Sequence, residues 1–196
     1  MQGQPEKVVN VCETALIAVG ANLPRPGVSL AETVTSAIAA VAQKAEGYQK
    51  VSRLYRTPCF PVGAGPDYVN AAFSLRYSGA ADDLILMLHE IERDYNRERT
   101  KRWGNRTLDL DLIAFGNRVS PDEATFRFWH GLKPEQQTIR APDSLILPHP
   151  RMQDRAFVLV PLADVAPDWQ HPVLGLTVLQ MLSTLPENDK KAIEPL

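Results

Sequence analysis

The sequence predicts an α+β fold in which helices pack on a mostly antiparallel sheet. Two segments carry apolar residues at intervals of three and four, which is typical of amphipathic helices. Between and around them lie short apolar or alternating runs of the kind that form strands. Neither internal repeats nor low-complexity linkers divide the 196 residues, so we expect a single domain, residues 1–196, with one sizeable core.

The overall composition argues against a nucleic-acid or membrane partner. The formal net charge is −2, and no apolar run reaches the roughly eighteen residues that a membrane-spanning helix needs. The N-terminus has no basic segment followed by an apolar one, so no secretory signal is expected. Cys12 and Cys59 lie far apart and form no metal-binding spacing. We therefore expect a cytoplasmic protein with reduced thiols, acting as a monomer.

The first elements along the chain are a buried strand and a capped helix. Thr14–Gly20 is a short apolar run, consistent with a first strand. Ser29 and Glu32 have the spacing of a capping box, in which each side chain bonds the other residue's backbone N–H. Apolar residues then recur at helical spacing, so we expect a helix from about Leu30 to Ala45.

A second pair of strands precedes the second helix. Val51–Thr57 and Tyr68–Tyr77 have strand character, and the Pro- and Gly-rich segment Pro58–Asp67 is expected to connect them as a loop. Leucines and isoleucine then repeat at helical spacing, which predicts a helix from about Ala81 to Arg97. The segment from Arg93 to Arg106 holds six Lys or Arg against two acids. Such a run is commonly a solvated face, but here it leads into a chemically marked strand and indicates an anion site.

That strand begins at Thr107, where polar and apolar residues start to alternate. Residues two apart on a strand point the same way, so Asp109 and Asp111 should project side by side. Two such carboxylates repel each other unless a cation lies between them, and Mg²⁺ is commonly bound by one or two carboxylates, waters and substrate phosphates. Arg102 and Arg106, just upstream, suit phosphate oxygens. The alternative is a solvated strand face without a metal.

The segment 116–146 is the least regular part of the sequence. Ser120-Pro121-Asp122-Glu123 combines a Ser N-cap, a Pro at the first helical position and a capping box, so we expect a helix from Pro121 to His130 ended by Gly131. Phe126 and Trp129 should share a face that docks on the body, because so short a helix is not stable alone. The docked helix is either a structural pad, which we favour slightly, or a cover near a nucleotide site.

The last part of the chain contains a turn, an apolar run and a helix. Leu147–Met152 forms a turn punctuated by prolines. Phe157–Leu162 is a further apolar run, and Thr177–Leu185 is expected to be a short helix.

Five segments of this chain together resemble one enzyme family. RWGNRTLDLDLIAFG (102–116), with ALIAVGANL, SRLYRTPCF, PDYVNAA and PHPRMQDRAFVLVPLADVAPDW in the same order, is similar to the 6-hydroxymethyl-7,8-dihydropterin pyrophosphokinases of folate biosynthesis. The resemblance implies a ferredoxin-like core in a three-layer α/β/α arrangement. It also implies transfer of pyrophosphate from ATP to 6-hydroxymethyl-7,8-dihydropterin with release of AMP.

The resemblance further implies a metal and nucleotide site. By similarity, Asp109 and Asp111 would bind two Mg²⁺ ions that bridge the ATP phosphates, with Arg97 and Arg106 as catalytic cations. The expected contacts with ATP are Arg97, Arg99, Arg106, Leu112, His149 and Arg155. Judged without the resemblance, His149 is a loop histidine fixed by its neighbouring prolines.

The pterin site implied by the resemblance is built from aromatic and amide side chains. Tyr68 and Phe157 match the family's stacking pair, Trp103 its third aromatic, and Asn70 the amide that reads the pterin edge. The loop residues expected to line the same pocket are Thr57, Pro58 and Phe60. Judged alone, Tyr68 and Phe157 would be assigned to the core.

Some positions depart from the family pattern, and two other functions are considered. Cys59 stands where a proline is frequent, the basic loop around Lys101 is one residue shorter than is common, and the connection 116–146 is longer. One alternative function is another Mg-dependent nucleotidyl or phosphoryl transferase. The other is a non-enzymatic RNA-binding ferredoxin-like module, which the near-neutral charge disfavours.

Overall fold

A computed structural model describes residues 12–59, 65–95, 107–133, 136 and 139–196. Its centre is an antiparallel sheet with the strand order β5-β1-β4-β3-β6, and β2 also pairs with β4. The strands are β1 (Glu13–Ala21), β2 (Tyr48–Val51), β3 (Tyr55–Thr57), β4 (Tyr68–Tyr77), β5 (Asp109–Phe115) and β6 (Glu194–Pro195). In the described part of the chain, no helix is long and apolar enough to span a bilayer.

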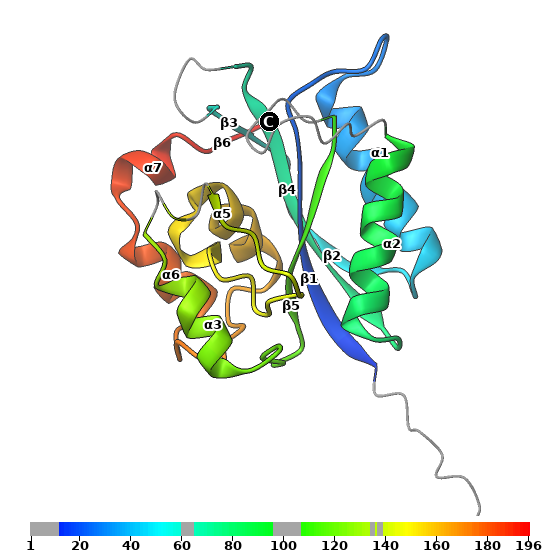
Figure 1. Ribbon diagram of the computed structural model, residues 1–196. Helices are drawn as coiled ribbons and strands as arrows, with labels where there is room; N and C mark the ends of the chain where they lie inside the picture. Colours follow the sequence, from blue (N-terminus) through cyan, green and yellow to red (C-terminus); the bar gives the residue numbers. More distant parts are fainter. Residues whose placement is uncertain (1–11, 60–64, 96–106, 134–135, 137–138) are drawn as a thin grey trace, which may run out of the picture.

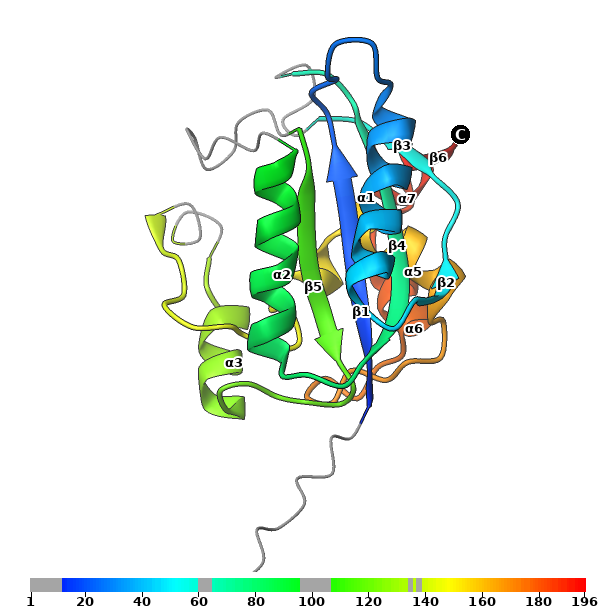
Figure 2. The same cartoon turned by 90° about the vertical axis from the view of Figure 1, so that its right-hand side faces the viewer.

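Helices cover both faces of the sheet, which gives three layers (Figures 1 and 2). One face carries α1 (Leu30–Lys44) and α2 (Ala81–Asp94). The other carries α5 (Ala156–Val165) and α6 (Val178–Thr184), with α3 (Glu123–His130), α7 (Glu187–Lys191) and the 3₁₀ turn Met152–Asp154 on the same side. Each face has its own buried apolar cluster. The predicted α+β fold with helices on an antiparallel sheet is therefore confirmed. β1 lies inside the sheet, between β5 and β4, and β4 is the strand that joins β1 to β2 and β3.

Several predicted elements form for the predicted reasons. The Ser29 side chain accepts the N–H of Glu32, and the Glu32 carboxylate accepts the N–H of Ser29, so the capping box is present at the start of α1. β4 spans Tyr68–Tyr77 as predicted. A second capping box joins Thr177 and Gln180 at the start of α6.

The predicted single strand Val51–Thr57 is wrong, because it is divided into β2 and β3. Ser52 replaces regular strand pairing at the break. Its backbone N–H donates to Ala72 O at 2.9 Å, and its Oγ accepts the N–H of Ala72 at 2.9 Å. The next residue, Arg53, turns its backbone N–H toward Asp164 on α5. The break is therefore made by a side chain and a distant helix.

The apolar run Phe157–Leu162 lies within a helix, α5, on which Phe157 is 41% exposed. The assignment of Phe157 to the core, which follows when this residue is judged without the family resemblance, is therefore wrong. The helix buries Val158, Leu159 and Leu162 against the sheet. A short apolar run has no readable period, so its sequence does not distinguish a buried helix from a buried strand.

The short helix in the segment 116–146 exists, but its predicted N-cap is wrong. Asp122 caps α3, because its Oδ1 accepts the N–H of Thr125 at 2.8 Å, and Gly131 ends the helix as predicted. The backbone of Ser120 is occupied elsewhere, since it forms a two-way bridge with Leu147 at 3.0 and 3.1 Å.

The helix α3 docks through Phe126, which is fully buried. The Phe126 ring lies 5.1 Å from the ring of His171, in the segment that follows α5. Trp169, two residues before His171, donates its indole N–H to the carbonyl of Gly116 at 3.1 Å. Gly116 follows the last residue of β5, whereas Asp109 is the first, so α3 lies at the end of the sheet opposite Asp109 (Figures 1 and 2). This position favours the structural pad.

Phe126→Ala should therefore destabilise the protein by about 3–5 kcal/mol and leave the Michaelis constant for ATP unchanged, because it removes a buried ring far from Asp109. Chemical unfolding and steady-state kinetics would measure both. Phe128→Ala is the control, since Phe128 lies on the same helix and is 51% exposed. A raised Michaelis constant for ATP in a folded Phe126→Ala variant would instead support the cover.

A buried histidine makes this docking sensitive to acid. His171 is fully buried, and its Nδ1 accepts the N–H groups of Val173 and Leu174, each at 3.2 Å. Burial, with a smaller effect of nearby His130, lowers the pKa of His171 to about 4. The pKa in the unfolded chain is about 6.5, so protonation favours unfolding. Stability should be fully present above pH ~6.5 and fall as the pH drops toward 4.

Thermal unfolding across this pH range would test the effect. His171→Asn should be less stable at pH 7, but its melting temperature should change less between pH 6.5 and 4. Equal slopes in both proteins would show that other groups control the acid response.

Candidate active site

The candidate site is organised by one row of residues that crosses four neighbouring strands. Tyr55 on β3 pairs with Asn70 on β4, Asn70 with Gly20 on β1, and Gly20 with Asp109 on β5. Directly paired residues of antiparallel strands share a face of the sheet. This row, Tyr55–Asn70–Gly20–Asp109, therefore lies on one face, and it is the face that α5 covers.

Residues two positions along each strand extend the same face. Tyr68 pairs with Thr57, so both lie next to the row, on the side away from Asp111. Asp111 pairs with Ala18, which places the second carboxylate next to the first. The two β1 residues opposite the aspartates are thus a glycine and an alanine, and neither places a large side chain beside a carboxylate.

The position of the Asn70 side chain depends on a hydrogen bond to Thr57 and on the lack of a side chain at Gly20. Its Nδ2 donates to Thr57 Oγ1 at 2.7 Å, and both residues are buried. A β-carbon added to Gly20 would lie 2.3 Å from Asn70 Oδ1 and 3.9 Å from Tyr68 Cδ1. Asn70 can therefore lean across β1 only because residue 20 has no side chain.

Asp109 and Asp111 are both partly exposed, as the predicted alternation requires. Leu108, Leu110 and Leu112 are buried in the core that includes α1 and α2. The backbone between the aspartates is held by Glu92, a residue of α2 that is 1% exposed and whose Oε1 accepts the N–H of Leu110 at 2.8 Å. Because β5 is an edge strand, this N–H has no partner in the sheet on that side.

The turn 147–152 places His149 beside β5, where the charge of Asp109 acts on its side chain. The backbone N–H of His149 donates to Ile113 O at 2.8 Å, and its Nδ1 accepts the N–H of Arg151 at 3.1 Å. The residue keeps some exposed surface, but its imidazole is desolvated. Burial, then the charges of Arg155 and Arg151, lower the pKa of His149 to about 3, and Asp109 opposes this only partly. The imidazole is therefore neutral near pH 7, with Nε2–H as its donor.

The start of α5 contributes a cation and an aromatic ring. Arg155 occupies the N-cap position, and its guanidinium carbon lies 5.7 Å from the centre of the Phe157 ring. Because that ring is exposed at the first turn, it is available to a ligand.

The remaining predicted residues are placed as follows. Pro58 is exposed directly after Thr57. Leu112 is 3% exposed within the α1 and α2 core, so any contact with ATP would have to come from its backbone. Five predicted residues lie outside the described part of the chain: Phe60, Arg97, Arg99, Trp103 and Arg106. Lys101 and Arg102 also lie outside it.

Two residues of this site were not identified from the sequence. Glu92 falls on the apolar stripe of α2, four residues after buried Leu88, and a charge on such a stripe is a readable signal. The sequence marks Gly20 only as the end of a predicted strand. Its role depends on which residues of β4 and β5 lie beside it, and no local pattern in the sequence reveals that register.

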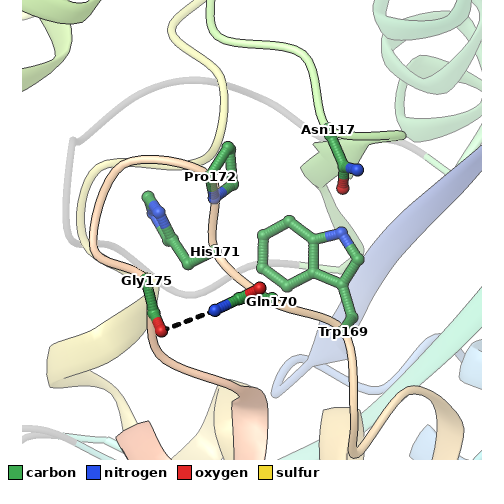
Figure 3. A pocket seen from close by; sticks show the side chains of 6 residues that line it. All are labelled: Asn117, Trp169, Gln170, His171, Pro172 and Gly175. Carbon is green, nitrogen blue, oxygen red and sulfur yellow. Dashed lines mark hydrogen bonds between the residues drawn. The ribbon is translucent and has the colours of Figure 1, made fainter.

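A separate surface pocket of about 460 Å³ lies at the opposite end of the sheet. Its lining includes Trp169, Gln170 and Gly175, and Gln170 Nε2 donates to Gly175 O at 2.8 Å (Figure 3). It contains none of the predicted site residues. Among the described residues, no group of three or more His, Cys, Asp or Glu could hold a metal by itself.

Comparison with known proteins gives consistent results. The family model described as 7,8-dihydro-6-hydroxymethylpterin-pyrophosphokinase (HPPK) matches residues 16–167. A 2-amino-4-hydroxy-6-hydroxymethyldihydropteridine pyrophosphokinase of Synechocystis sp. is 36% identical over 172 residues, which cover 87% of this chain and 75% of that protein. The enzyme of the same name from Pseudomonas aeruginosa is 36% identical over 157 residues, covering 80% and 82%.

A solved structure supports the fold. The Plasmodium falciparum HPPK-DHPS S436F/A437G/A613S triple mutant with SDX-DHP matches with a TM-score of 0.60 at 15% identity. The match covers 90% of this chain and 45% of that longer chain. The family match and the two bacterial enzymes establish that this chain belongs to the HPPK family of ATP-dependent pyrophosphokinases in folate biosynthesis.

Proposed function

We propose that Asp109 and Asp111 hold two Mg²⁺ ions with the phosphates of ATP, while 6-hydroxymethyl-7,8-dihydropterin lies along the Asn70–Thr57 side of the row. The observation that carries this proposal is the pairing of Gly20 with both Asp109 and Asn70. Neighbouring strands lie about 4.8 Å apart, so the backbones of Asp109 and Asn70 are separated by only about 10 Å. Both substrates can then meet above Gly20.

The donor set suits Mg²⁺. The described residues supply two neighbouring carboxylates and no group of three acidic, cysteine or histidine ligands, an arrangement that leaves coordination positions for waters and substrate phosphates. That is the usual environment of Mg²⁺ in phosphoryl-transfer sites. When bound, the ions would neutralise charge that develops on the phosphate oxygens.

The other described residues bind and orient the substrates. The neutral imidazole of His149 can donate a hydrogen bond from Nε2, and Arg155 supplies a positive charge near Phe157. Asn70 and Thr57 are already bonded to each other, so their remaining donor and acceptor groups are held in place for the pterin edge. Tyr68 and Phe157 are the proposed stacking partners. No protein nucleophile is required, since the pterin hydroxyl attacks the β-phosphorus directly with loss of its proton, and the bond from that phosphorus to the oxygen shared with the α-phosphate breaks as AMP leaves.

The decisive experiment incubates the protein with ATP, Mg²⁺ and 6-hydroxymethyl-7,8-dihydropterin and identifies the nucleotide product. AMP, formed only when the pterin is present, supports the proposal. ADP would indicate transfer of a single phosphoryl group and would contradict it. Omitting Mg²⁺, or replacing the pterin with water, provides the controls. We also propose that the enzyme acts in the cytoplasm as a monomer, without a nucleic-acid partner.

Phe157→Ala should weaken pterin binding by about 2- to 13-fold and leave ATP binding unchanged, because a stacking ring contributes about 0.5–1.5 kcal/mol beyond its buried area. Calorimetric titration with each ligand would measure the two affinities. Phe128→Ala is a matched control, since Phe128 is also an exposed helical phenylalanine but lies at the other end of the sheet. An equal loss for both ligands would indicate a general packing role for Phe157.

A further inference from the structure

The C-terminal half of α5 is tied to the sheet by a cluster around one carboxylate. Asp164 accepts four hydrogen bonds: from the Arg53 backbone N–H at 3.2 Å, Arg53 Nε at 3.2 Å, an Arg53 terminal nitrogen at 3.1 Å and Tyr55 Oη at 2.7 Å. Tyr55 is 3% exposed, and the guanidinium carbon of Arg53 lies 5.4 Å from the centre of its ring. We call Arg53, Tyr55 and Asp164 the α5 clamp.

The sheet end of the clamp belongs to the row of the candidate site. Tyr55 is the first residue of β3 and pairs directly with Asn70. Thr57, which accepts the hydrogen bond from Asn70, is two residues further along the same strand. Tyr55 is therefore connected through one short strand to both polar residues proposed to read the pterin.

The helix end of the clamp shares a stripe with Phe157. Asp164 follows Phe157 by seven residues, which is close to two full helical turns, so both side chains leave the same side of α5 about 10 Å apart along its axis. The rotation of the helix that brings Asp164 to Tyr55 thus also sets the direction of Phe157.

Pro161 removes one hydrogen bond from the backbone ladder of α5. Proline has no N–H, so the carbonyl of Phe157 lacks its usual i+4 partner within α5. The rest of the ladder remains, and Val158, Leu159 and Leu162 are buried on the same side of the sheet, so the first turn stays joined to the half of the helix that carries Asp164.

We propose that Asp164 is a positioning residue, which through Tyr55 and Arg53 holds the Phe157 wall of the pterin site at a fixed distance and orientation from the Asn70–Thr57 wall. This inference rests on the proposed function. It adds that affinity for the pterin depends on a carboxylate that does not touch it.

The electrostatics of the clamp agree with this role. Burial raises the pKa of Asp164, but hydrogen bonds from Arg53 and Tyr55 outweigh it and leave the pKa below its ordinary value. Burial, with the hydrogen bond to Asp164, raises the pKa of Tyr55 to about 12. Asp164 therefore stays an acceptor and Tyr55 a donor throughout the neutral range.

The test compares Asp164→Ala and Asp164→Asn with Glu194→Ala. Glu194 is a matched control, because it forms an ion pair with Arg56, also on β3, but ties that strand to β6 and not to α5. Asp164→Ala should raise the Michaelis constant for the pterin about 10-fold, change that for ATP less than about twofold, and leave kcat within about threefold. Asp164→Asn keeps an acceptor for Tyr55 and should recover part of the loss. Glu194→Ala should change neither constant.

A lower melting temperature in Asp164→Ala with an unchanged Michaelis constant for the pterin, measured well below that temperature, would overturn the positioning role. An equal rise in the Michaelis constants for both substrates would overturn it as well.

Hydrogen exchange separates this inference from the proposed function, because it needs no substrate. Asp164→Ala should speed amide exchange at the start of α5, and Glu194→Ala should not. If the wild-type protein fails to form AMP, the proposed function is wrong whatever the exchange shows; if AMP forms but exchange and pterin affinity are unchanged, only the clamp is wrong.

Discussion

Asp109→Asn and Asp111→Asn should each reduce pyrophosphoryl transfer by about 10³-fold or more. Each substitution removes a proposed charged oxygen ligand from two carboxylates that are neighbours on β5, and metal ions contribute several kcal/mol of charge stabilisation in such reactions. The amide keeps the shape of the side chain, so the strand and its contacts with β1 should be unchanged.

Stability provides a second, independent readout. Two like charges side by side destabilise the unliganded protein, so either substitution should leave its free energy of unfolding equal to or above that of the wild type in the absence of Mg²⁺. AMP formation, Mg²⁺ titration with a non-hydrolysable ATP analogue, and urea unfolding would measure the three quantities. Asp143→Asn, at an exposed carboxylate in the segment before Leu147, is the control. Near wild-type turnover in both site variants would exclude the aspartates as metal ligands.

The elements that could be predicted from the sequence are those whose causes are local. The capping box at Ser29, the uninterrupted strand Tyr68–Tyr77 and the alternation at Asp109–Asp111 each depend on residues a few positions apart. The elements that were wrong depend on partners far along the chain. Ser52 ends β2 by bonding to Ala72, and Ser120 does not cap α3 because Leu147 occupies its backbone.

The candidate site shows the same division. The residues marked by chemistry, such as the aspartate pair and His149, could be singled out from the sequence and its resemblance to a family. The residues that make their arrangement possible are harder to find. Glu92 is marked by a charge on an apolar helix stripe, but its partner, the Leu110 N–H, is not. Gly20 is identified only when the register of β1, β4 and β5 is known.

Gly20→Ala should raise the Michaelis constant for the pterin by about 10- to 100-fold with little change for ATP. The backbone at residue 20 is ordinary strand, so alanine is conformationally acceptable there. The effect comes from space, because the new β-carbon would lie 2.3 Å from Asn70 Oδ1 and 3.4 Å from its Cγ. Asn70 is buried and cannot move aside without breaking its 2.7 Å hydrogen bond to Thr57. The amide that we propose to read the pterin edge would thus be displaced by the added methyl group.

The same clash should cost stability, by about 1–3 kcal/mol for overpacking and about 1 kcal/mol for the lost hydrogen bond. Asn70→Ala separates the two effects. In the double variant, the clash is relieved, so Gly20→Ala should destabilise the protein less in the Asn70→Ala background than in the wild type, whereas pterin affinity should stay low in all three variants. Chemical unfolding and pterin titration would complete this cycle. A Gly20→Ala protein that binds the pterin as tightly as the wild type would show that Asn70 does not need the space above β1, and the arrangement proposed for the two substrates would have to be abandoned.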